Sequence, residues 1–232
     1  MTNAANRIAV ILPALNEEES VAKVIEEIPV EVLERNGYKV QVIVVDNNST
    51  DKTRVLAEQA GATVLFEPLR GKGRAIQTAF NTLYADYVFM LDADYTYPAG
   101  HIVEMLEVLR HKDVVIGSRL TGRREKGSIT RLNVVGNILL SFLATLLYGK
   151  HASDLCTGYW GFKGKVIKNI NLHNVSGFEL ETRLFIEIVK RGYTFSEIPI
   201  NYRCRAGGCA KLNPLRDGLG IAFSLVRNRF KS

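Results

Sequence analysis

Cysteine is scarce in this chain: the 232 residues include three, and no two of them stand at the Cys-x-x-Cys spacing. An odd number of widely spaced cysteines argues against a disulfide framework and against a zinc site, and it indicates a reducing compartment. The first seven residues lack the basic and then apolar layout of a secretory signal peptide. The phosphate-loop pattern GxxxxGK[ST] is also missing. We therefore expect a cytoplasmic protein without a Walker-type nucleotide site.

Long apolar runs are few as well. The longest lies in residues 131–148 and is interrupted by Asn137 and Ser141, so it falls short of the roughly 20 residues that span a bilayer. We expect a helix there, either packed in the core or lying at a membrane surface, and the helix alone favours core packing. Four of its uncharged polar residues recur every four positions and make a narrow stripe on one face. They are Asn133, Asn137, Ser141 and Thr145.

Acidic residues are outnumbered by basic ones, which gives a net charge of +6. The excess is concentrated in two segments, 119–131 and 203–231. Such clusters favour an anionic partner: a diphosphate, a lipid headgroup or a nucleic acid. Because no nucleic-acid module with interleaved aromatic residues is visible, we expect no nucleic-acid partner.

Apolar runs alternate with amphipathic segments through the first half of the chain. Five runs have the pattern of buried strands, at residues 7–13, 40–46, 62–66, 88–91 and 113–117. Helices are expected between them, one ending near Ile28 and the others at about 51–60, 72–84 and 99–110. Strands that alternate with helices form a mainly parallel sheet with helices on both faces. The expected fold class is therefore α/β, with one Rossmann-like domain over residues 1–232.

Two carboxylates, Asp92 and Asp94, stand at the end of the buried run 88–91. Side chains alternate along a strand, so residues two apart can point the same way. Two converging carboxylates repel each other unless a cation lies between them, and Mg²⁺ is typically held by one or two carboxylates plus substrate phosphates. The pair therefore predicts a metal–diphosphate site. The alternative is a polar turn in which Asp94 caps the following segment.

Further polar residues fall at the ends of other expected strands. Ligands of open parallel sheets bind outside the carboxyl ends of the strands, which is where Pro13, Asn16, Glu17 and Asp46 lie together with the two aspartates. Asp46 can accept hydrogen bonds from a nucleobase, or it can cap the helix 51–60. The glycines around Lys72 let the backbone approach a ligand at a helix start; a plain turn is the alternative.

The second half of the chain departs from the strict alternation. Residues 119–130 form a basic, glycine-containing loop ahead of the helix 131–148. The elements expected after it are a strand-like aromatic segment at 154–162, a helix at 178–190, a strand at 194–202, a basic loop at 203–211 and a terminal helix that begins at Asn213-Pro214. No repeat or linker interrupts the chain, so we expect one domain.

Eight short motifs, in their order and spacing, resemble those of the family-2 glycosyltransferases with the GT-A fold, and within them the dolichyl- and polyprenyl-phosphate hexose synthases. They are Pro13-Ala-Leu-Asn-Glu-Glu18, Asp46-Asn-Asn-Ser-Thr-Asp51, Gly71-Lys-Gly73, Asp92-Ala-Asp94, Gly117-Ser-Arg119, Asp154-Leu-Cys-Thr-Gly-Tyr159, Phe178-Glu-Leu-Glu181, and Pro199-Ile-Asn-Tyr-Arg203 with Lys211-Leu. The resemblance implies an inverting transfer of a hexose, mannose or glucose, from a GDP- or UDP-sugar to a polyprenyl (dolichyl) phosphate. It also implies Mg²⁺ or Mn²⁺ at Asp92 and Asp94. One departure is Thr96, which stands where the family often has Gln.

The resemblance divides the chain into a nucleotide-sugar and metal half, 7–118, and an acceptor half, 119–232. In the first half it assigns the nucleotide sugar to Pro13, Asn16, Glu17, Asp46, Lys72 and Asp92. It assigns catalysis to Asp92, Asp94 and Arg119, and the acceptor or its phosphate to Arg119, Arg123, Arg131, Arg203 and Lys211. A phosphate acceptor is already anionic at neutral pH and needs no strong base. A hydroxyl acceptor would need one, and the candidates for a base or sugar contact are Asp154 and Glu181.

Three other functions stay open. One is a glycosyltransferase with a saccharide or small soluble acceptor, and the second is a sugar-nucleotidyltransferase. The third is a non-catalytic module that binds nucleotide sugars. For the lipid acceptor, an enzyme without a spanning helix has to come to the bilayer, so we expect peripheral attachment to the cytoplasmic face through the segment 119–148 and the terminal helix.

Overall fold

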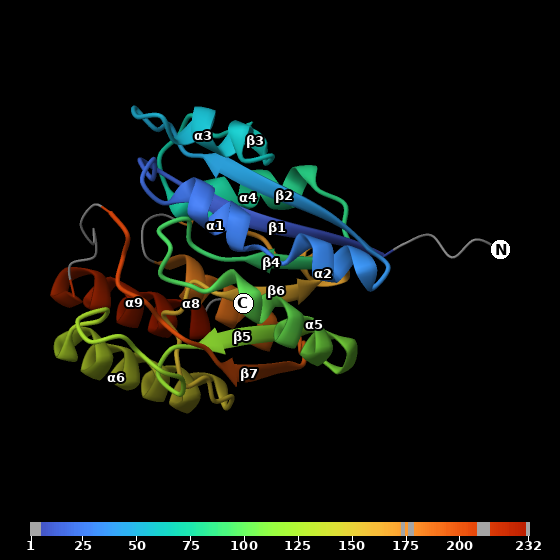
Figure 1. The fold of residues 1–232 in the computed structure, drawn as a ribbon. Helices are drawn as coiled ribbons and strands as arrows, with labels where there is room; N and C mark the ends of the chain where they lie inside the picture. The colour runs from blue at the N-terminus through green and yellow to red at the C-terminus, as the bar shows by residue number, and fades with distance from the viewer. Residues whose placement is uncertain (1–5, 173–174, 176–178, 208–213, 231–232) are drawn as a thin grey trace.

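A seven-stranded sheet forms the centre of the computed structural model, which describes residues 6–172, 175, 179–207 and 214–230. The strand order is β3-β2-β1-β4-β6-β5-β7 (Figure 1). The strands are β1 (Asn6–Ala14), β2 (Tyr38–Asp46), β3 (Thr63–Phe66), β4 (Tyr87–Met90), β5 (Val114–Ser118), β6 (Trp160–Lys163) and β7 (Phe195–Pro199). Neighbouring strands are parallel except where β6 pairs antiparallel with β4 and β5. The predicted α/β class with a mainly parallel sheet is confirmed.

Helices cover both faces of the sheet, as Figure 1 shows. Along β1, Ile8, Val10 and Leu12 enter one apolar core, while Ala9 and Ile11 enter the other, because successive side chains of a strand point to opposite faces. The first core is shared with α1 (Val21–Glu27), α2 (Val30–Arg35), α3 (Thr53–Gln59) and α5 (Ile102–His111). The second is shared with α4 (Lys72–Thr82), α7 (Gly164–Ile167), α8 (Leu180–Lys190) and α9 (Pro214–Arg229).

Helix α6 (Arg131–Tyr148) has the predicted bounds, but it packs on the core along only part of its circumference. Ala144 is buried in the second core, whereas Phe142 and Leu146 are 66% and 71% exposed. The expectation that favoured core packing therefore holds for one part of the helix and is wrong for the exposed apolar residues. Asn137 and Ser141 of the polar stripe are 4% and 3% exposed because they bind backbone: Asn137 Oδ1 accepts from Cys156 N at 3.3 Å and Ser141 Oγ from Leu155 N at 3.1 Å. Buried amides need such partners.

Helices α6 and α9 lie side by side at one edge of the molecule (Figure 1). Together they present a surface that we call the apolar face. Its exposed residues are Leu132, Val135, Ile138, Leu139, Phe142 and Leu146 of α6, Leu219, Phe223 and Val226 of α9, and Phe230 just after α9. Within the described part of the chain, α6 is the one helix long and apolar enough to cross a membrane, with a mean hydropathy of 1.4. An uncovered apolar surface of this kind marks an interaction site.

Several predicted elements differ in detail from those observed. The aromatic segment 154–162 becomes a strand only from Trp160 onward, and β7 ends at Pro199 rather than near Tyr202. Helices α2 and α7 were not predicted. Residues 178 and 213, where two predicted helices were to begin, lie outside the described residues.

Candidate active site

Lys72 is the first residue of α4 and connects three segments at the carboxyl end of the sheet. Its Nζ atom lies 2.6 Å from Oδ1 of Asp92, after β4, and 2.6 Å from Oε1 of Glu181, on α8. Burial alone would lower the pKa of Lys72, but the two carboxylates raise it above its ordinary value. Lys72 is therefore a fixed ammonium beside the first aspartate. Three residues of predicted function, Lys72, Asp92 and Glu181, are brought together here, and a role of Glu181 as a base or sugar contact stays a prediction.

The second carboxylate, Asp94, is buried and uses both of its oxygens. Its Oδ1 accepts from Thr96 N at 3.1 Å and from Thr96 Oγ1 at 2.6 Å. Its Oδ2 accepts from Nη1 of Arg205 at 2.9 Å, and Nη2 of the same guanidinium pairs with Glu17. Burial and the nearby Asp92 raise the pKa of Asp94 above its usual range. Asp94 caps the following turn, as the alternative prediction held, and it also faces a cation.

These contacts fit a divalent cation. Asp92 and Asp94 offer the hard oxygen ligands that Mg²⁺ and Mn²⁺ prefer, and each of them already lies against a positive side chain. No group of three or more His, Cys, Asp or Glu side chains that could hold a metal occurs among the described residues. The other ligands of an ion at this pair would therefore be water or phosphate oxygens.

The backbone next to the two aspartates is tightly constrained. A Cβ atom on Gly158 would lie 2.6 Å from Oδ2 of Asp92, so a side chain there would displace the carboxylate. Tyr95, between Asp94 and Thr96, has a φ of +69°. A non-glycine residue in the left-handed region is uncommon and costs free energy. Strain at this position accompanies the short hydrogen bonds that orient Asp94.

Four of the predicted nucleotide residues lie at the ends of β1 and β2 or in the loop after β1: Pro13, Asn16, Glu17 and Asp46. Asn16, with a φ of +58°, accepts from Thr50 N at 2.8 Å, and Ser49 N donates to Asp46 Oδ1 at 3.1 Å. Pro13 pairs in register with Val45 of β2. Asp46 therefore closes its own turn, whereas Asp51 caps the start of the next helix through Thr53 N at 2.9 Å. Contact of these residues with a base or ribose stays a prediction.

Arg119 and Asp154 form a buried ion pair. Nε and Nη2 of Arg119 donate to the two carboxylate oxygens at 2.8 and 2.7 Å, and Arg119 N donates to Oδ2 at 2.9 Å. Nδ2 of Asn137, on α6, donates to Oδ1 at 2.5 Å. Burial would raise the pKa of Asp154, but Arg119 holds it below its ordinary value. A fully buried carboxylate that is held in this way orients Arg119, and the geometry does not favour Asp154 as a general base.

The other predicted phosphate-binding residues differ in their surroundings. Arg203 makes two hydrogen bonds to Glu27, at 2.9 and 2.6 Å, and lies over the ring of Tyr95. Arg123 and Arg131 are exposed, and no carboxylate of the described chain pairs with either. Lys211 lies outside the described residues.

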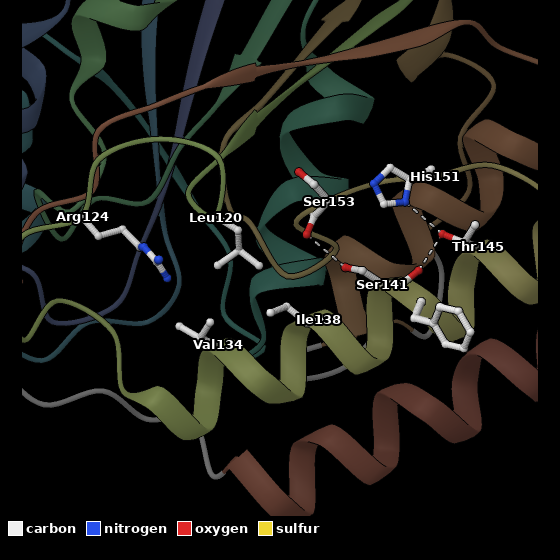
Figure 2. Close-up of a pocket in the computed structure, with 9 residues that line it drawn as sticks. Leu120, Arg124, Val134, Ile138, Ser141, Thr145, His151 and Ser153 are labelled. Carbon is white, nitrogen blue, oxygen red and sulfur yellow. Dashed lines mark hydrogen bonds between the residues drawn. The ribbon is translucent and has the colours of Figure 1, made fainter.

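A cavity of about 410 Å³ lies between α6 and the segment after β5 (Figure 2). Helix α6 contributes both apolar side chains and two members of the polar stripe, Ser141 and Thr145, to its lining. The lining residues are Leu120, Arg124, Val134, Ile138, Ser141, Phe142, Thr145, His151 and Ser153. Figure 2 shows Arg124 at one end of the group and His151 at the other. The cavity therefore joins the apolar face to one of the exposed basic residues.

Residues 9–170 match the family model for "Glycosyl transferase family 2". The chain belongs to this family. The glycosyltransferase is 37% identical over 228 residues to "Glycosyltransferase AglJ" of Haloferax volcanii, covering 97% of this chain and 72% of the relative. It is 32% identical over 221 residues to the "Dolichyl-phosphate hexose transferase" of the same organism, covering 95% and 92%.

The fold of this glycosyltransferase is also found in solved structures. A glucosyl-3-phosphoglycerate synthase from Mycobacterium tuberculosis, in complex with Mn²⁺, UDP-glucose and phosphoglyceric acid, matches with a TM-score of 0.75 at 24% identity, covering 97% of this chain and 80% of that one. At this identity the likeness establishes the shared fold, GT-A.

Sequence reasoning missed two residues of the site. Arg205 was noted only as part of a basic segment, although it contacts both Asp94 and Glu17. Asn137 was noted only as part of a polar stripe, although it holds Asp154. The available signals were a second arginine two residues after the Tyr202-Arg203 motif, and the recurrence of polar residues on an otherwise apolar helix.

Proposed function

We propose that this glycosyltransferase moves a hexose from a nucleoside diphosphate to the phosphate of a polyprenol at a membrane surface. The observation that carries the proposal is the apolar face of α6 and α9, which lies next to the exposed Arg123, Arg124 and Arg131; no carboxylate among the described residues pairs with these three. A lipid phosphate presents the complementary pair of features, an anionic head and an apolar chain.

The donor half of the proposal rests on the family and on the carboxyl end of the sheet. Asp92 and Asp94 would hold Mg²⁺ or Mn²⁺, and a bound ion offsets negative charge on the leaving nucleoside diphosphate. Lys72 carries a permanent charge beside Asp92 and stands at the start of α4, where backbone amides favour phosphate. The glucosyl-3-phosphoglycerate synthase crystallised with Mn²⁺ and UDP-glucose supports this assignment.

The acceptor half rests on the relative named as a dolichyl-phosphate hexose transferase and on the state of Asp154. A phosphate with its second pKa near 6 attacks C1 of the sugar as an anion, with inversion, and needs no base. This agrees with an Asp154 that is fully engaged by Arg119 and Asn137. Arg119 is held in a fixed orientation, as an arginine that recognises phosphate would be.

The membrane contact is proposed as peripheral, with the apolar face lying in the interfacial region and the basic residues at the headgroups. The cavity beside α6 would take the first isoprene unit of the acceptor, because its apolar wall is continuous with that face. Arg124 at the cavity would lie near the lipid phosphate. On this basis we also propose the cytoplasmic face of a membrane as the location.

A donor and acceptor panel tests the proposal. GDP-mannose, UDP-glucose and UDP-N-acetylglucosamine, each radiolabelled, are incubated with Mg²⁺ and either dolichyl phosphate, 3-phosphoglycerate or a free saccharide. The expected result is label in the organic phase with dolichyl phosphate and one preferred donor. Label only in water-soluble product would assign a soluble acceptor. In a reaction given a sugar phosphate and a nucleoside triphosphate instead, release of diphosphate would assign a nucleotidyltransferase. Binding of nucleotide sugars without turnover would assign a non-catalytic module.

A further inference from the structure

Arg205 binds the second aspartate of the site and the loop after β1 at the same time. Its Nη1 atom donates to Asp94 Oδ2 at 2.9 Å, and its Nη2 atom pairs with Glu17. Its Nε atom donates to Gly207 O at 2.7 Å, which fixes the side chain against its own backbone. Both carboxylates are only 12% exposed at the side chain. One guanidinium thus connects three segments that lie far apart in the sequence.

The backbone around Arg205 contacts the same segments as its side chain. Arg203 N donates to Thr96 O at 2.9 Å, and Ala206 N to Asp94 O at 3.3 Å. Gly207 lies so close to the loop after β1 that a Cβ atom would come 2.1 Å from Glu19 Oε2. The segment 203–207 is therefore seated on the donor side of the site, and Arg205 is the charged contact that holds it there.

The contacts of Asp94 decide where an ion would bind. Asp94 Oδ1 is bound by Thr96, so Oδ2 is the oxygen available to an ion, and Oδ2 faces Arg205. An ion there would lie beside a like charge, and like charges a few ångströms apart repel strongly in a partly buried site.

We propose that a metal ion displaces Arg205 from Asp94. Arg205 binds Asp94 and Glu17 in the metal-free enzyme, and it leaves Asp94 when the metal–nucleotide enters. The displaced guanidinium can then bind the incoming diphosphate, because the N–H groups of a planar guanidinium match the spacing of phosphate oxygens. Arg205 thus acts as a positioning residue that holds the segment 203–207 against Asp94 before the donor binds and against the donor afterwards.

The identity of the metal and of the diphosphate rests on the proposed function, but the exchange itself is tested without any acceptor or turnover. Binding of Mn²⁺ alone is measured by the electron-spin signal of the free ion. Arg205→Gln should bind Mn²⁺ at least about tenfold more tightly than the wild type, because a competing charge is gone. The matched control is Arg203→Gln, which loses the same charge two residues away but pairs with Glu27; its Mn²⁺ affinity should stay at the wild-type value.

Nucleotide binding should respond in the opposite direction. With Mn²⁺ saturating, Arg205→Gln should bind the nucleoside diphosphate about tenfold more weakly, the scale of one charge-assisted contact. Mn²⁺ affinity in Arg205→Gln that equals or falls below the wild-type value would contradict the displacement of Arg205 by the metal. An increase in Mn²⁺ affinity of the same size in Arg203→Gln would contradict it as well. Circular dichroism and thermal unfolding establish that both variants are folded.

A measurement on the wild-type protein needs no variant. Hydrogen exchange at the amides of Arg203 and Ala206 is followed with and without Mn²⁺ and nucleoside diphosphate. In the metal-free protein both amides should be protected. Mn²⁺ alone should speed exchange at Ala206, because its amide donates to the main-chain oxygen of Asp94 and loses support when Arg205 leaves the Asp94 carboxylate. Unchanged exchange at Ala206 across Mn²⁺ concentrations that saturate the site would contradict the proposal. A failure of lipid transfer in the acceptor panel would leave these results unaffected, so the two hypotheses fail separately.

Discussion

The ammonium of Lys72 lies 2.6 Å from Oδ1 of Asp92 and compensates the charge of this carboxylate. Because Lys72 also binds Glu181, Asp92 is held before any ligand arrives. Asp94 is oriented by Thr96, which binds its Oδ1 atom, while Oδ2 faces Arg205. Lys72 and Thr96 thus preorganise the two aspartates and would stay in place when Arg205 is displaced, and such preorganisation limits rearrangement at the moment of reaction.

Replacing either aspartate should remove transfer without unfolding the protein. We expect Asp92→Asn and Asp94→Asn each to lower kcat by about 10²-fold or more, since each weakens binding of the ion that would offset negative charge on the leaving nucleoside diphosphate. The measurement is the initial rate over a Mg²⁺ titration, with thermal unfolding as the control for the fold. Near wild-type rates in the presence of EDTA would show that the pair holds no metal.

Substituting Gly158 should impair activity as strongly as substituting Asp92, which Gly158 contacts. Gly158→Ala places a methyl group 2.6 Å from Asp92 Oδ2, and overpacking of this kind typically costs about 1–3 kcal/mol. We expect weaker Mn²⁺ binding and a lower kcat in this variant. The matched control is Gly136→Ala in α6, where nothing lies within 4 Å and where the change should stabilise the helix by up to about 1 kcal/mol. Equal effects of the two substitutions would contradict the crowding argument.

The Arg119–Asp154 pair should make a pH-dependent contribution to stability. Removing one partner of a buried pair typically costs about 3–5 kcal/mol, so Asp154→Ala should lower the free energy of unfolding by that order. The folded-state pKa of Asp154 is depressed. Its contribution is therefore complete above the unfolded value, about 3.9, and is lost as the pH falls through the folded value.

Urea unfolding of the wild type and of Asp154→Ala at pH 7, 5 and 3.5 measures this dependence. The difference between the two proteins should be constant from pH 7 to 5 and should shrink toward pH 3.5. A difference that grows on acidification would mean that Asp154 is protonated in the folded protein. The exposed Lys165–Asp113 pair provides the comparison, since Lys165→Ala should cost less than about 1 kcal/mol.

The apolar face should bind anionic vesicles at low salt. Phe142→Ser with Leu146→Ser should reduce co-sedimentation with phosphatidylserine vesicles, while Val55→Ser with Tyr84→Ser, which removes equally exposed apolar side chains elsewhere, should not. Replacing Arg123, Arg124 and Lys126 by Ser should weaken binding by about 1 kcal/mol per residue and reduce its salt dependence. Nucleotide affinity should be unchanged in all of these variants. Absence of vesicle binding at every salt concentration, with full transfer to a soluble acceptor, would remove the membrane from the proposal.

The strands and the edge of the sheet where the site lies were predictable because both follow from local patterns. The apolar runs before Asp46 and Asp92 end in polar residues, and parallel strands bring such ends to one edge. The partners of those residues were not predictable in this way. Lys72 and Glu181 are 109 positions apart, and Arg205 and Glu17 are 188 apart, so their meeting depends on packing that no local pattern encodes.

Helix α6 illustrates why its orientation could not be predicted. Periodicity located the helix and its polar stripe correctly, but a stripe does not say which side is covered. The buried side is decided by the backbone of Leu155 and Cys156, whose amides donate to Ser141 and Asn137. The requirement to pair those amides prevails over burial of Phe142 and Leu146.

Strand β6 connects the two halves of the sheet, since it pairs with β4 on one side and with β5 on the other. The close packing of β6 between these strands requires glycine at position 161, because a Cβ atom on Gly161 would lie 2.7 Å from Val115 and 2.9 Å from Phe89. During synthesis β4 and β5 leave the ribosome well before β6, so each presents an unpaired edge until residues 160–163 arrive. A nascent chain that stalls near residue 118 should therefore aggregate or recruit a chaperone, and a fragment 1–118 should not fold by itself.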